Sequence, residues 1–313
     1  MLTLFTTPKP FQGHINIIQR NALKSWTLLH PDVEVILFGD DEGAAEVAAE
    51  LRIRHEPFAQ RHESGMKYLD YIFDRGQELA QREVVCYANC DIILTPDFSR
   101  AVERVRAARR RFLLVGHRWD ADISAPVDFS DPEWASKVQR TAAEANDRKN
   151  EWFIDYFCFP RGLYSGQVPP LLIGRTWWDN FLLWKARDLG ASVVDASTMF
   201  RAVHQNHDYG YHPKGRDGVW SDELSKRNSD LAGGGKNVCN LLDVTARLTR
   251  GGRLRPVRFR RRRWQIKNWA ATTTAWRAWE KIWYRLLDLT YDTRHSTGLT
   301  RQGFARARAR LGK

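Results

Sequence analysis

Two polar residues interrupt an apolar stretch at residues 86–98, which read CYANCDIILTPDF. Asn89 and Asp91 are two positions apart, so on an extended chain their side chains point to the same face. An ionised carboxyl group in a buried strand is costly unless it is paired, hydrogen-bonded or bound to a metal ion. The pattern therefore predicts that Asp91 faces a charged partner or a cation.

The densest group of histidines lies in VHQNHDYGYH, residues 203–212, where Asp208 accompanies His204, His207 and His212. Their spacing fits neither a zinc finger nor an HExxH helix, so a structural zinc site is not expected. One interpretation is a set of metal ligands, because imidazole and carboxylate together suit Mn²⁺ as well as Mg²⁺. The alternative is a solvated loop whose histidines pack on tyrosines.

Apolar runs alternate with helical patterns along residues 1–215. Strands are expected at 2–6, 33–41, 84–94, 112–120, 155–164 and 191–197, and helices at 14–29, 42–52, 65–81, after Pro96 and from about Arg175. Such alternation with short connections predicts an α/β fold in which helices cover both faces of a mostly parallel sheet.

Ligands of such sheets gather at the carboxyl ends of the strands. Polar residues follow three of the expected strands, in VILFGDD, VVCYANCD and FLLVGHRWD. A nucleotide site at this edge is therefore expected. Neither GxGxxG after the first strand nor GxxxxGK[ST] occurs in the sequence, which argues against a Rossmann dehydrogenase and a P-loop NTPase.

With this element order, Asn89-Cys90-Asp91 resembles the DxD motif of GT-A fold nucleotide-sugar glycosyltransferases. The resemblance implies a divalent cation, Mn²⁺ or Mg²⁺, that bridges the diphosphate of the sugar donor and neutralises the leaving group. It assigns Asp91 and His207 as metal ligands. Asn89 departs from the motif, because a neutral amide is a weaker ligand than a carboxylate.

The same resemblance places the donor near the first strands. Thr6 and Thr7, at the end of the first strand, and Asp40, at the end of the second and preferred over Asp41, are expected to approach the nucleoside. Ser64 and Gly65 precede an expected helix whose first N–H groups would approach the diphosphate, with Lys67 nearby. Ser64 is equally well explained as a helix cap.

The acceptor half is expected after the metal motif. Trp177, Trp178 and Asp179 lie near the start of the helix in 169–190, where indole rings can stack on a sugar and a carboxylate can accept a proton. In inverting enzymes of this family a carboxylate at a comparable helix start is the base, so Asp179 is the predicted catalytic base. Alternatively, both tryptophans are core residues, and the Asp179 carboxylate stabilises the start of the helix by its interaction with the positive end of the helix dipole.

Charge divides the chain at residue 247. Residues 247–313 contain 19 Lys and Arg against 3 Asp and Glu, a net charge of +16; the total of +12 leaves −4 for residues 1–246. We therefore expect a catalytic domain over 1–246 and a basic, Trp-rich amphipathic helical appendage over 247–313. Such a helix suits an anionic membrane surface, although it could instead pack on the catalytic domain or contact nucleic acid phosphates.

Composition limits the remaining choices. A hydrophobic content of 43% over 313 residues predicts a folded protein, and no apolar run has the length of a membrane span. No signal peptide is recognised, so the expected location is cytoplasmic, peripheral on the inner face of the membrane, with all four cysteines reduced.

The predicted function is transfer of a sugar from a nucleotide-diphosphate donor to a hydroxyl of a glycan or lipid-linked acceptor. A nucleic-acid-binding protein is an alternative that explains the basic appendage but fits the acidic body poorly. A nucleotidyltransferase of similar fold is a second alternative.

Overall fold

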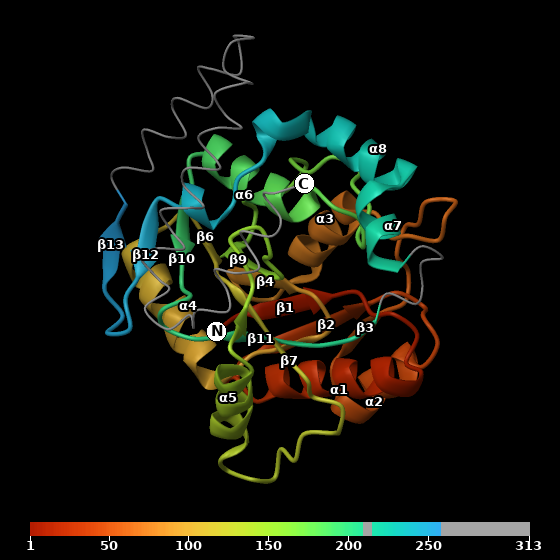
Figure 1. The fold of residues 1–313 in the computed structure, drawn as a ribbon, viewed down its shortest axis with the longest axis vertical. Coiled ribbons are helices and arrows are strands. Elements are labelled where there is room, and N and C mark those ends of the chain that lie inside the picture. The colour runs from red at the N-terminus through yellow and green to blue at the C-terminus, as the bar shows by residue number, and fades with distance from the viewer. Residues whose placement is uncertain (209–214, 258–313) are drawn as a thin grey trace, which may run out of the picture. The chain divides into compact units, whose positions relative to one another are not determined.

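A nine-stranded sheet forms the centre of the protein (Figure 1). The structure is a computed structural model that describes residues 1–208 and 215–257. The strand order is β13-β12-β10-β6-β9-β4-β1-β2-β3. In chain order the strands are β1 (Thr3–Thr6), β2 (Glu34–Phe38), β3 (Arg54–Glu56), β4 (Val84–Ala88), β6 (Phe112–Val115), β9 (Tyr156–Pro160), β10 (Ser192–Asp195), β12 (Ala246–Leu248) and β13 (Leu254–Pro256).

Most neighbouring strands of this sheet are parallel. Strand β9 runs antiparallel to β4 and β6, and β13 runs antiparallel to β12. Because the other strands share one direction, their carboxyl ends emerge at one edge of the sheet, where ligands of open α/β sheets bind.

A second, four-stranded sheet lies in the order β5-β11-β7-β8. Its strands are short: β5 (Ile92–Ile93), β7 (Arg118–Ala121), β8 (Asp147–Arg148) and β11 (Ala202–Gln205). Strand β5 follows β4 after three residues, and β7 follows β6 after two. The small sheet thus begins where two central strands of the large sheet end.

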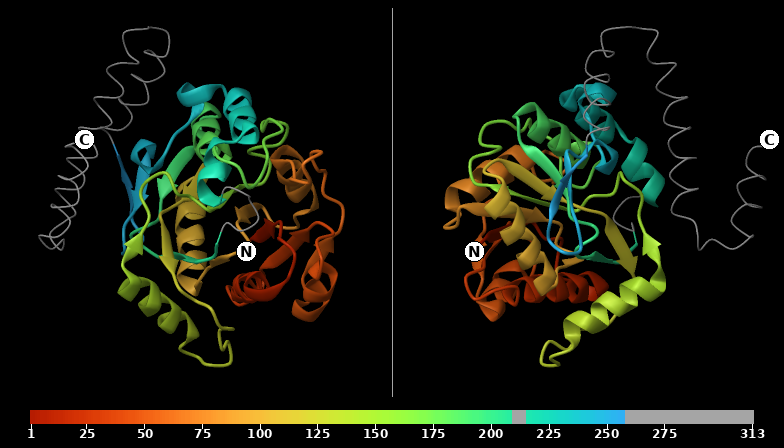
Figure 2. Two further views of the ribbon diagram at one scale, coloured as in Figure 1. Left: turned by 45° about the vertical axis from the view of Figure 1, so that its right-hand side comes forward. Right: turned by 90° about the vertical axis from the view of Figure 1, so that its left-hand side faces the viewer.

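Helices cover both faces of the large sheet. They are α1 (Gly13–Thr27), α2 (Ala44–Leu51), α3 (Leu69–Leu79), α4 (Pro96–Ala108), α5 (Trp134–Ala145), α6 (Trp178–Asp188), α7 (Gly215–Ser221) and α8 (Glu223–Ala232). Figure 1 shows α1 and α2 on one side of β1–β3 and α3 and α6 on the other. Helix α5 covers the small sheet instead, as the views in Figure 2 show, and packs on it through Trp134, Val138 and Ala142.

Successive side chains of each strand point to opposite faces of the large sheet, so the hydrophobic core has one layer on each face. In β1, Leu4 packs with Leu23 and Trp26 of α1, whereas Phe5 points to the opposite face and contacts Phe73 of α3 with ring centroids 5.6 Å apart. Residues buried on both faces make each strand a continuous apolar run, the pattern from which the strands are predicted.

The α/β architecture with a mostly parallel sheet between helices is confirmed. Three local expectations differ. Helix α3 begins at Leu69 rather than at residue 65, the expected strand 112–120 divides between β6 and β7 of different sheets, and His204 lies in strand β11 rather than in a loop.

The expected domain boundary at residue 247 falls inside β12. Strands β12 and β13 extend the large sheet beyond this residue. The shift in charge therefore begins before the sheet ends. The expected amphipathic helix, from Arg258 onward, lies outside the described residues. Within the described residues, no helix has the length and apolar character that crossing a membrane requires.

Candidate active site

The small sheet aligns three side chains at the end of β4. Strand β11 pairs with β5 so that His204 lies opposite Ile92, and with β7 so that His204 lies opposite Asp120. Asp91 directly precedes β5, and His207 follows β11 by two residues. The register of this sheet, rather than any local motif, brings Asp91, His204 and His207 together.

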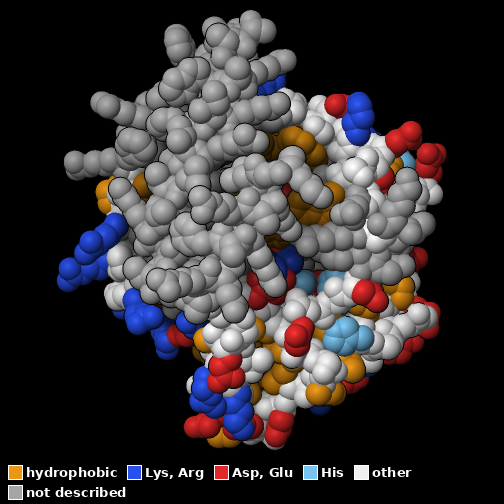
Figure 3. Space-filling view, in the orientation of Figure 1, with side chains coloured by type: hydrophobic (Ala, Val, Ile, Leu, Met, Phe, Trp, Pro, Cys, Tyr) orange, Lys and Arg blue, Asp and Glu red, His pale blue; other side chains and the backbone are white. Residues whose placement is uncertain are grey.

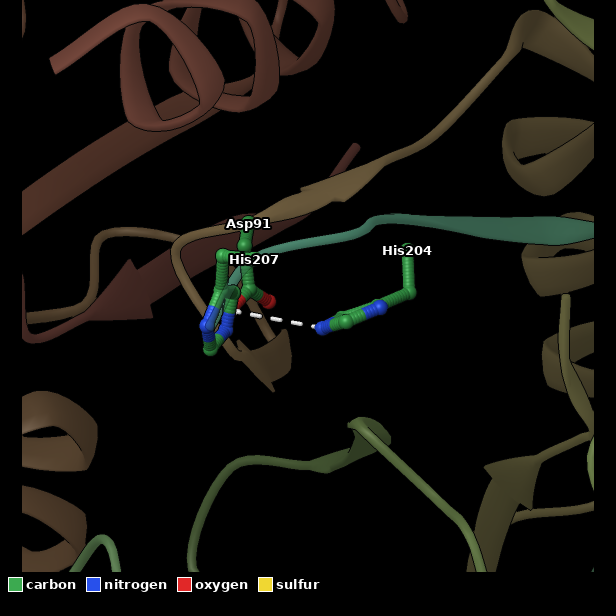
Figure 4. Close-up of side chains that lie close together, drawn as sticks. All are labelled: Asp91, His204 and His207. Carbon is green, nitrogen blue, oxygen red and sulfur yellow. Dashed lines mark ion pairs between the residues drawn. The ribbon is translucent and has the colours of Figure 1, made fainter. Parts of the chain in front are cut away.

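The three side chains converge on one point (Figure 4). The Asp91 Oδ2 atom lies 3.3 Å from Nε2 of His207 and 3.7 Å from Nε2 of His204. Their ligand atoms all lie within 4.8 Å of one another, and Asp91 Oδ1 is buried with no hydrogen-bond partner among the described residues. One carboxylate and two imidazoles with an unsatisfied oxygen form a donor set that fits a divalent cation such as Mn²⁺.

Electrostatics keep Asp91 ionised. Burial by itself raises the pKa of this carboxyl, but the charges of His204 and His207 and a hydrogen bond from His207 lower the pKa well below its ordinary value overall. A cation bound here would meet a carboxylate that is already deprotonated.

Asp120 orients one of the imidazoles. Its Oδ1 atom lies 3.3 Å from Nδ1 of His204, so that Nε2 of the same ring is directed toward Asp91. Arg118 donates to both carboxylate oxygens of Asp120, at 2.6 and 3.2 Å, and Lys149 Nζ lies 3.2 Å from Oδ2. Although burial opposes it, the close approach of the His204 ring and the hydrogen bonds from Arg118 lower the pKa of Asp120. A carboxylate behind a ligating histidine is a common means of fixing the ring and its tautomer.

Arg118, which pairs with Asp120, also pairs with Asp155. Its Nη1 atom lies 3.2 Å from Asp155 Oδ2, while the Asn89 side-chain amide donates to Asp155 Oδ1 at 2.6 Å. Asn89 thus directs its amide nitrogen to Asp155 and positions the chain ahead of Asp91. Its expected part in holding the donor stays a prediction.

Asp179 lies in the first turn of α6, as predicted. Burial and, to a smaller extent, the charge of Asp155 raise the pKa of its carboxyl, whereas the backbone N–H of Asn180 and the charge of Arg118 lower it; the resulting pKa is about 7. Trp177, two residues before Asp179, has a φ of 86°, a left-handed conformation that costs a bulky residue of order 1–3 kcal/mol and is concentrated at functional sites. A carboxyl that exchanges a proton near neutral pH is suited to general base catalysis.

Trp178, directly before Asp179, is buried, with its ring centroid 5.6 Å from Tyr87 and 5.4 Å from Phe157. Of the two interpretations of Trp178, a core residue or a stacking surface for a sugar, the burial of its ring supports the core residue.

At the end of β2, the Asp41 side chain rather than that of Asp40 is enclosed by neighbouring side chains. Asp41 is 10% exposed and pairs with Lys67, whose Nζ also donates to the Pro8 carbonyl at 2.8 Å. Asp40 is 75% exposed and is bound only by Arg61 at 2.7 Å among the described contacts. The sequence-based preference for Asp40 over Asp41 is therefore not supported by burial.

Gly39 allows the chain to turn after β2 so that Asp41 lies beside Lys67. Its φ of 110° is open to glycine, and a Cβ added there would lie 2.7 Å from Asp41 Oδ2 and 2.9 Å from Lys67 Cε. Thr6 is fully buried at the end of β1, and Thr7 follows at the same edge. Lys67 and the two threonines thus border the same strand ends, as expected from the sequence.

Ser64 and Gly65 do not begin a helix. They lie in a tight turn in which the Gly65 N–H donates to the His62 carbonyl at 2.8 Å, and Ser64 Oγ lies 2.9 Å from His62 Nδ1. Helix α3 starts four residues later, so the expected approach of its first N–H groups to a diphosphate at Ser64 and Gly65 is wrong, as is the helix-cap alternative for Ser64.

The Asp91 cluster and the Asp41–Lys67 pair lie at the same edge of the large sheet. The charges of Asp91, Lys67 and Asp41 all act on the buried thiol of Cys90, whose pKa burial raises. Figure 3 shows acidic, basic and imidazole side chains together in a recess near the centre of one face.

Three residues of the site, Asp120, Arg118 and Asp155, are not predicted from the sequence, and His204 is predicted only as one member of the histidine group in residues 203–212. The available signal was the polar ending of FLLVGHRWD, since Asp120 is its last residue. Asp120 reaches His204 only through the pairing of β7 with β11, across 84 positions of sequence.

No family model matches the chain, and no curated protein matches it in sequence. Solved structures match it in fold. A Staphylococcus aureus TarS structure with UDP-GlcNAc has a TM-score of 0.43 at 9% identity, covering 66% of this chain and 58% of that one. Glucosyl-3-phosphoglycerate synthase from Mycobacterium tuberculosis, with Mg²⁺ and UDP, has a TM-score of 0.41 at 12% identity, covering 66% and 72%.

A third match is the mannosyltransferase PcManGT from Pyrobaculum calidifontis, with GDP-Man and Mn²⁺: TM-score 0.41, 13% identity, 67% of this chain and 58% of that one. The chain thus spans less than two thirds of the TarS and PcManGT chains. The α/β fold is defined by the order and direction of the strands in the mostly parallel sheet. The carboxylate–imidazole cluster at the strand ends is a separate observation.

Proposed function

We propose that this chain is a metal-dependent glycosyltransferase, which moves a sugar from a nucleotide-diphosphate donor to a hydroxyl group of a glycan or lipid-linked acceptor. The observation that carries the proposal is the combination of the Asp91–His204–His207 cluster and Asp179 around one strand edge. A bound cation would neutralise the negative charge of a diphosphate leaving group. A carboxyl with a pKa of about 7 can accept the proton of an acceptor hydroxyl.

Asp91, His204 and His207 would hold the cation, Mn²⁺ or Mg²⁺. When bound, the cation would neutralise negative charge that develops on the diphosphate as it leaves. Asp120 holds His204 in the ligating orientation, and Arg118 holds Asp120. The donor nucleoside would lie along Thr6, Thr7 and the Asp41–Lys67 pair, because these residues end the neighbouring strands.

Asp179 would act on the acceptor. Its carboxylate takes the proton of the acceptor hydroxyl, the hydroxyl oxygen forms a bond to the anomeric carbon, and the bond from that carbon to the diphosphate oxygen breaks. The nucleoside diphosphate leaves with the bonding electron pair. This assignment corresponds to inversion at the anomeric carbon.

The decisive experiment is a panel of UDP-, GDP- and dTDP-sugars and nucleoside triphosphates, tested for thermal stabilisation and hydrolysis with Mn²⁺ and with EDTA. We expect stabilisation by at least one nucleotide-sugar, lost in EDTA and lost in Asp91→Asn. The matched control is Asp230→Asn, which removes an exposed carboxyl that pairs with Lys226 in α8 and does not contact the cluster. Absence of any Mn²⁺-dependent donor response would refute the proposal, and a response to triphosphates alone would indicate a nucleotidyltransferase.

We also propose that the chain works in the cytoplasm at an anionic membrane surface, contacted by the basic residues 247–313. Support comes from the net charge of +16 in that region and its regularly spaced tryptophans. Salt-sensitive binding to nucleic acid without any donor response would favour a nucleic-acid-binding protein instead.

A further inference from the structure

The rings of Phe153 and Trp220 are in contact, and Trp152 precedes Phe153 in the same loop; we call these three residues the aromatic platform. Trp152 is 37% exposed and Trp220 is 47% exposed, which makes them unusual among large apolar residues of the described chain. The Phe153 and Trp220 rings lie 5.7 Å apart at an interplanar angle of 44°. The platform joins the loop after β8 to helix α7.

The platform is connected to the candidate active site by direct contacts. The Arg118 guanidinium lies 5.2 Å from the centre of the Phe153 ring, and the same guanidinium pairs with Asp155 at 3.2 Å. On the other side, the Asn180 side chain donates to the Trp152 carbonyl at 3.4 Å, and Asn180 directly follows Asp179 in α6. The aromatic rings therefore adjoin the residues that surround the predicted base.

The loop that carries two of the rings is held in place by its own hydrogen bonds. The Asn150 side chain accepts from the Trp152 N–H at 3.1 Å, and the Asn150 carbonyl accepts from the Phe153 N–H at 3.2 Å. The Leu241 N–H also donates to the Glu151 carbonyl at 3.1 Å. A binding surface held in this way loses little conformational entropy when a ligand is bound.

We propose that the aromatic platform binds a pyranose ring of the acceptor, and that the enzyme therefore uses a glycoside rather than a simple alcohol. This inference rests on the proposed glycosyltransferase function. The apolar face of a pyranose packs on an aromatic ring, while its hydroxyl groups need polar partners close by. The platform offers this combination, since Arg118, Lys149 and Asp155 border it.

Charge favours a neutral ligand over an anionic membrane surface. Arg118 and Lys149 are paired with the carboxylates of Asp120 and Asp155, so the polar residues beside the platform carry no excess positive charge that would attract anionic headgroups. Trp178 cannot form this surface, because its ring is buried against Tyr87 and Phe157.

The test compares the full-length protein with Trp220→Ala, Trp152→Ala and Trp220→Phe. The matched control is Phe58→Ala, because Phe58 is 61% exposed and contacts Tyr71 on another surface. The probes are methyl glycosides of cellobiose, lactose, maltose and chitobiose, with binding measured by calorimetry and transfer measured with the donor found in the nucleotide-sugar panel.

We expect Trp220→Ala to weaken disaccharide binding and raise the acceptor KM about tenfold, with Trp220→Phe restoring most of both. Donor hydrolysis and donor-induced thermal stabilisation should stay at the wild-type level in every variant. Equal disaccharide binding by wild type and Trp220→Ala, or no binding of any disaccharide by wild type, would overturn the inference. If the wild type shows no Mn²⁺-dependent donor response, the proposed function itself fails.

Discussion

At the scale of single residues, Asp91 and Asn89 have different surroundings although they are two positions apart. Asp91 faces two imidazoles and keeps a buried oxygen without a partner among the described residues, whereas Asn89 is bound to Asp155. The two residues of the NxD motif are therefore not equivalent ligands. Asp91 has the environment of a metal ligand, and Asn89 has that of a positioning residue.

We predict that Asp91→Asn abolishes Mn²⁺ binding, whereas Asn89→Ala retains it within about tenfold, because only Asp91 contributes a charged oxygen to the cluster. Electron paramagnetic resonance of free Mn²⁺ during titration measures both affinities without any substrate. Equal losses in the two variants would show that Asn89 is a ligand of the same rank.

Asp179 leads to a pH prediction. A base with a pKa of about 7 is half ionised at pH 7 and only about one tenth ionised at pH 6. We therefore expect kcat/KM to rise from pH 6 to pH 8 with an apparent pKa near 7, and Asp179→Asn to lower kcat by about 100-fold or more. A pH-independent rate, or an active Asp179→Asn, would exclude Asp179 as the base and favour a retaining reaction.

The same carboxyl affects stability with a defined sign. Its folded-state pKa lies above the ordinary value, so the protonated form favours folding. This contribution is complete below the unfolded-state pKa of about 4 and is lost progressively as the pH rises from there through about 7. We expect Asp179→Asn to raise the melting temperature relative to wild type, by more at pH 8 than at pH 5. The difference between the two pH values cancels any pH-independent effect of the amide on packing.

At the scale of elements, the small sheet determines the site. Strands β5, β11 and β7 place Asp91, His204 and Asp120 next to one another, and no single element contains two of these residues. A change that disturbs the β7–β11 pairing would therefore act on the metal cluster without touching its ligands.

We predict that Asp120→Asn lowers the affinity for Mn²⁺ by about 10- to 100-fold, because His204 loses the carboxylate that holds its ring. The same Mn²⁺ titration measures this effect, and Asp147→Asn on neighbouring β8 is the control, as it removes an acidic residue of the same sheet that does not contact His204. Wild-type affinity in Asp120→Asn would show that the β11 backbone alone orients the ring.

At the scale of the whole molecule, charge separates a mildly acidic body from a basic end. Residues 1–246 carry a net charge of −4 and residues 247–313 carry +16. The sheet continues through β13 at Pro256, so a truncation that starts before Arg250 would remove strands of the large sheet. Variants that test membrane binding should therefore change residues after Val257.

We predict that replacing the four arginines at 260–263 with glutamine weakens binding to vesicles that contain phosphatidylserine by two to three orders of magnitude, at about 1 kcal/mol for each basic residue. Flotation with anionic and with neutral vesicles measures the effect, and a control that replaces Arg100, Arg104, Arg106 and Arg109 in or next to α4 tests for a general loss of charge. Unchanged flotation of the 260–263 variant would contradict the proposed membrane contact.

The sequence by itself determined most strands of the large sheet, the helices between them and the edge at which polar residues follow the strands. Buried strands such as β4 are continuous apolar runs, and the polar residues that follow them mark the strand ends. Local signals of this kind led to Asp91 as a site candidate, whereas His207 and Asp179 were predicted from the resemblance to GT-A fold glycosyltransferases. Local signals failed at the start of α3, where a tight turn at Gly65 replaces the first turn of the expected helix.

Only the tertiary structure decided which side chains meet. The pairing of His204 with Asp120, the burial of Asp41 beside Lys67 and the raised pKa of Asp179 beside Asp155 all join residues that are distant in sequence. Periodicity and propensity describe interactions over a few residues, whereas strand register and electrostatic environment depend on the packing of the whole chain. For this reason the sequence predicts the kind of site, and the fold determines its geometry.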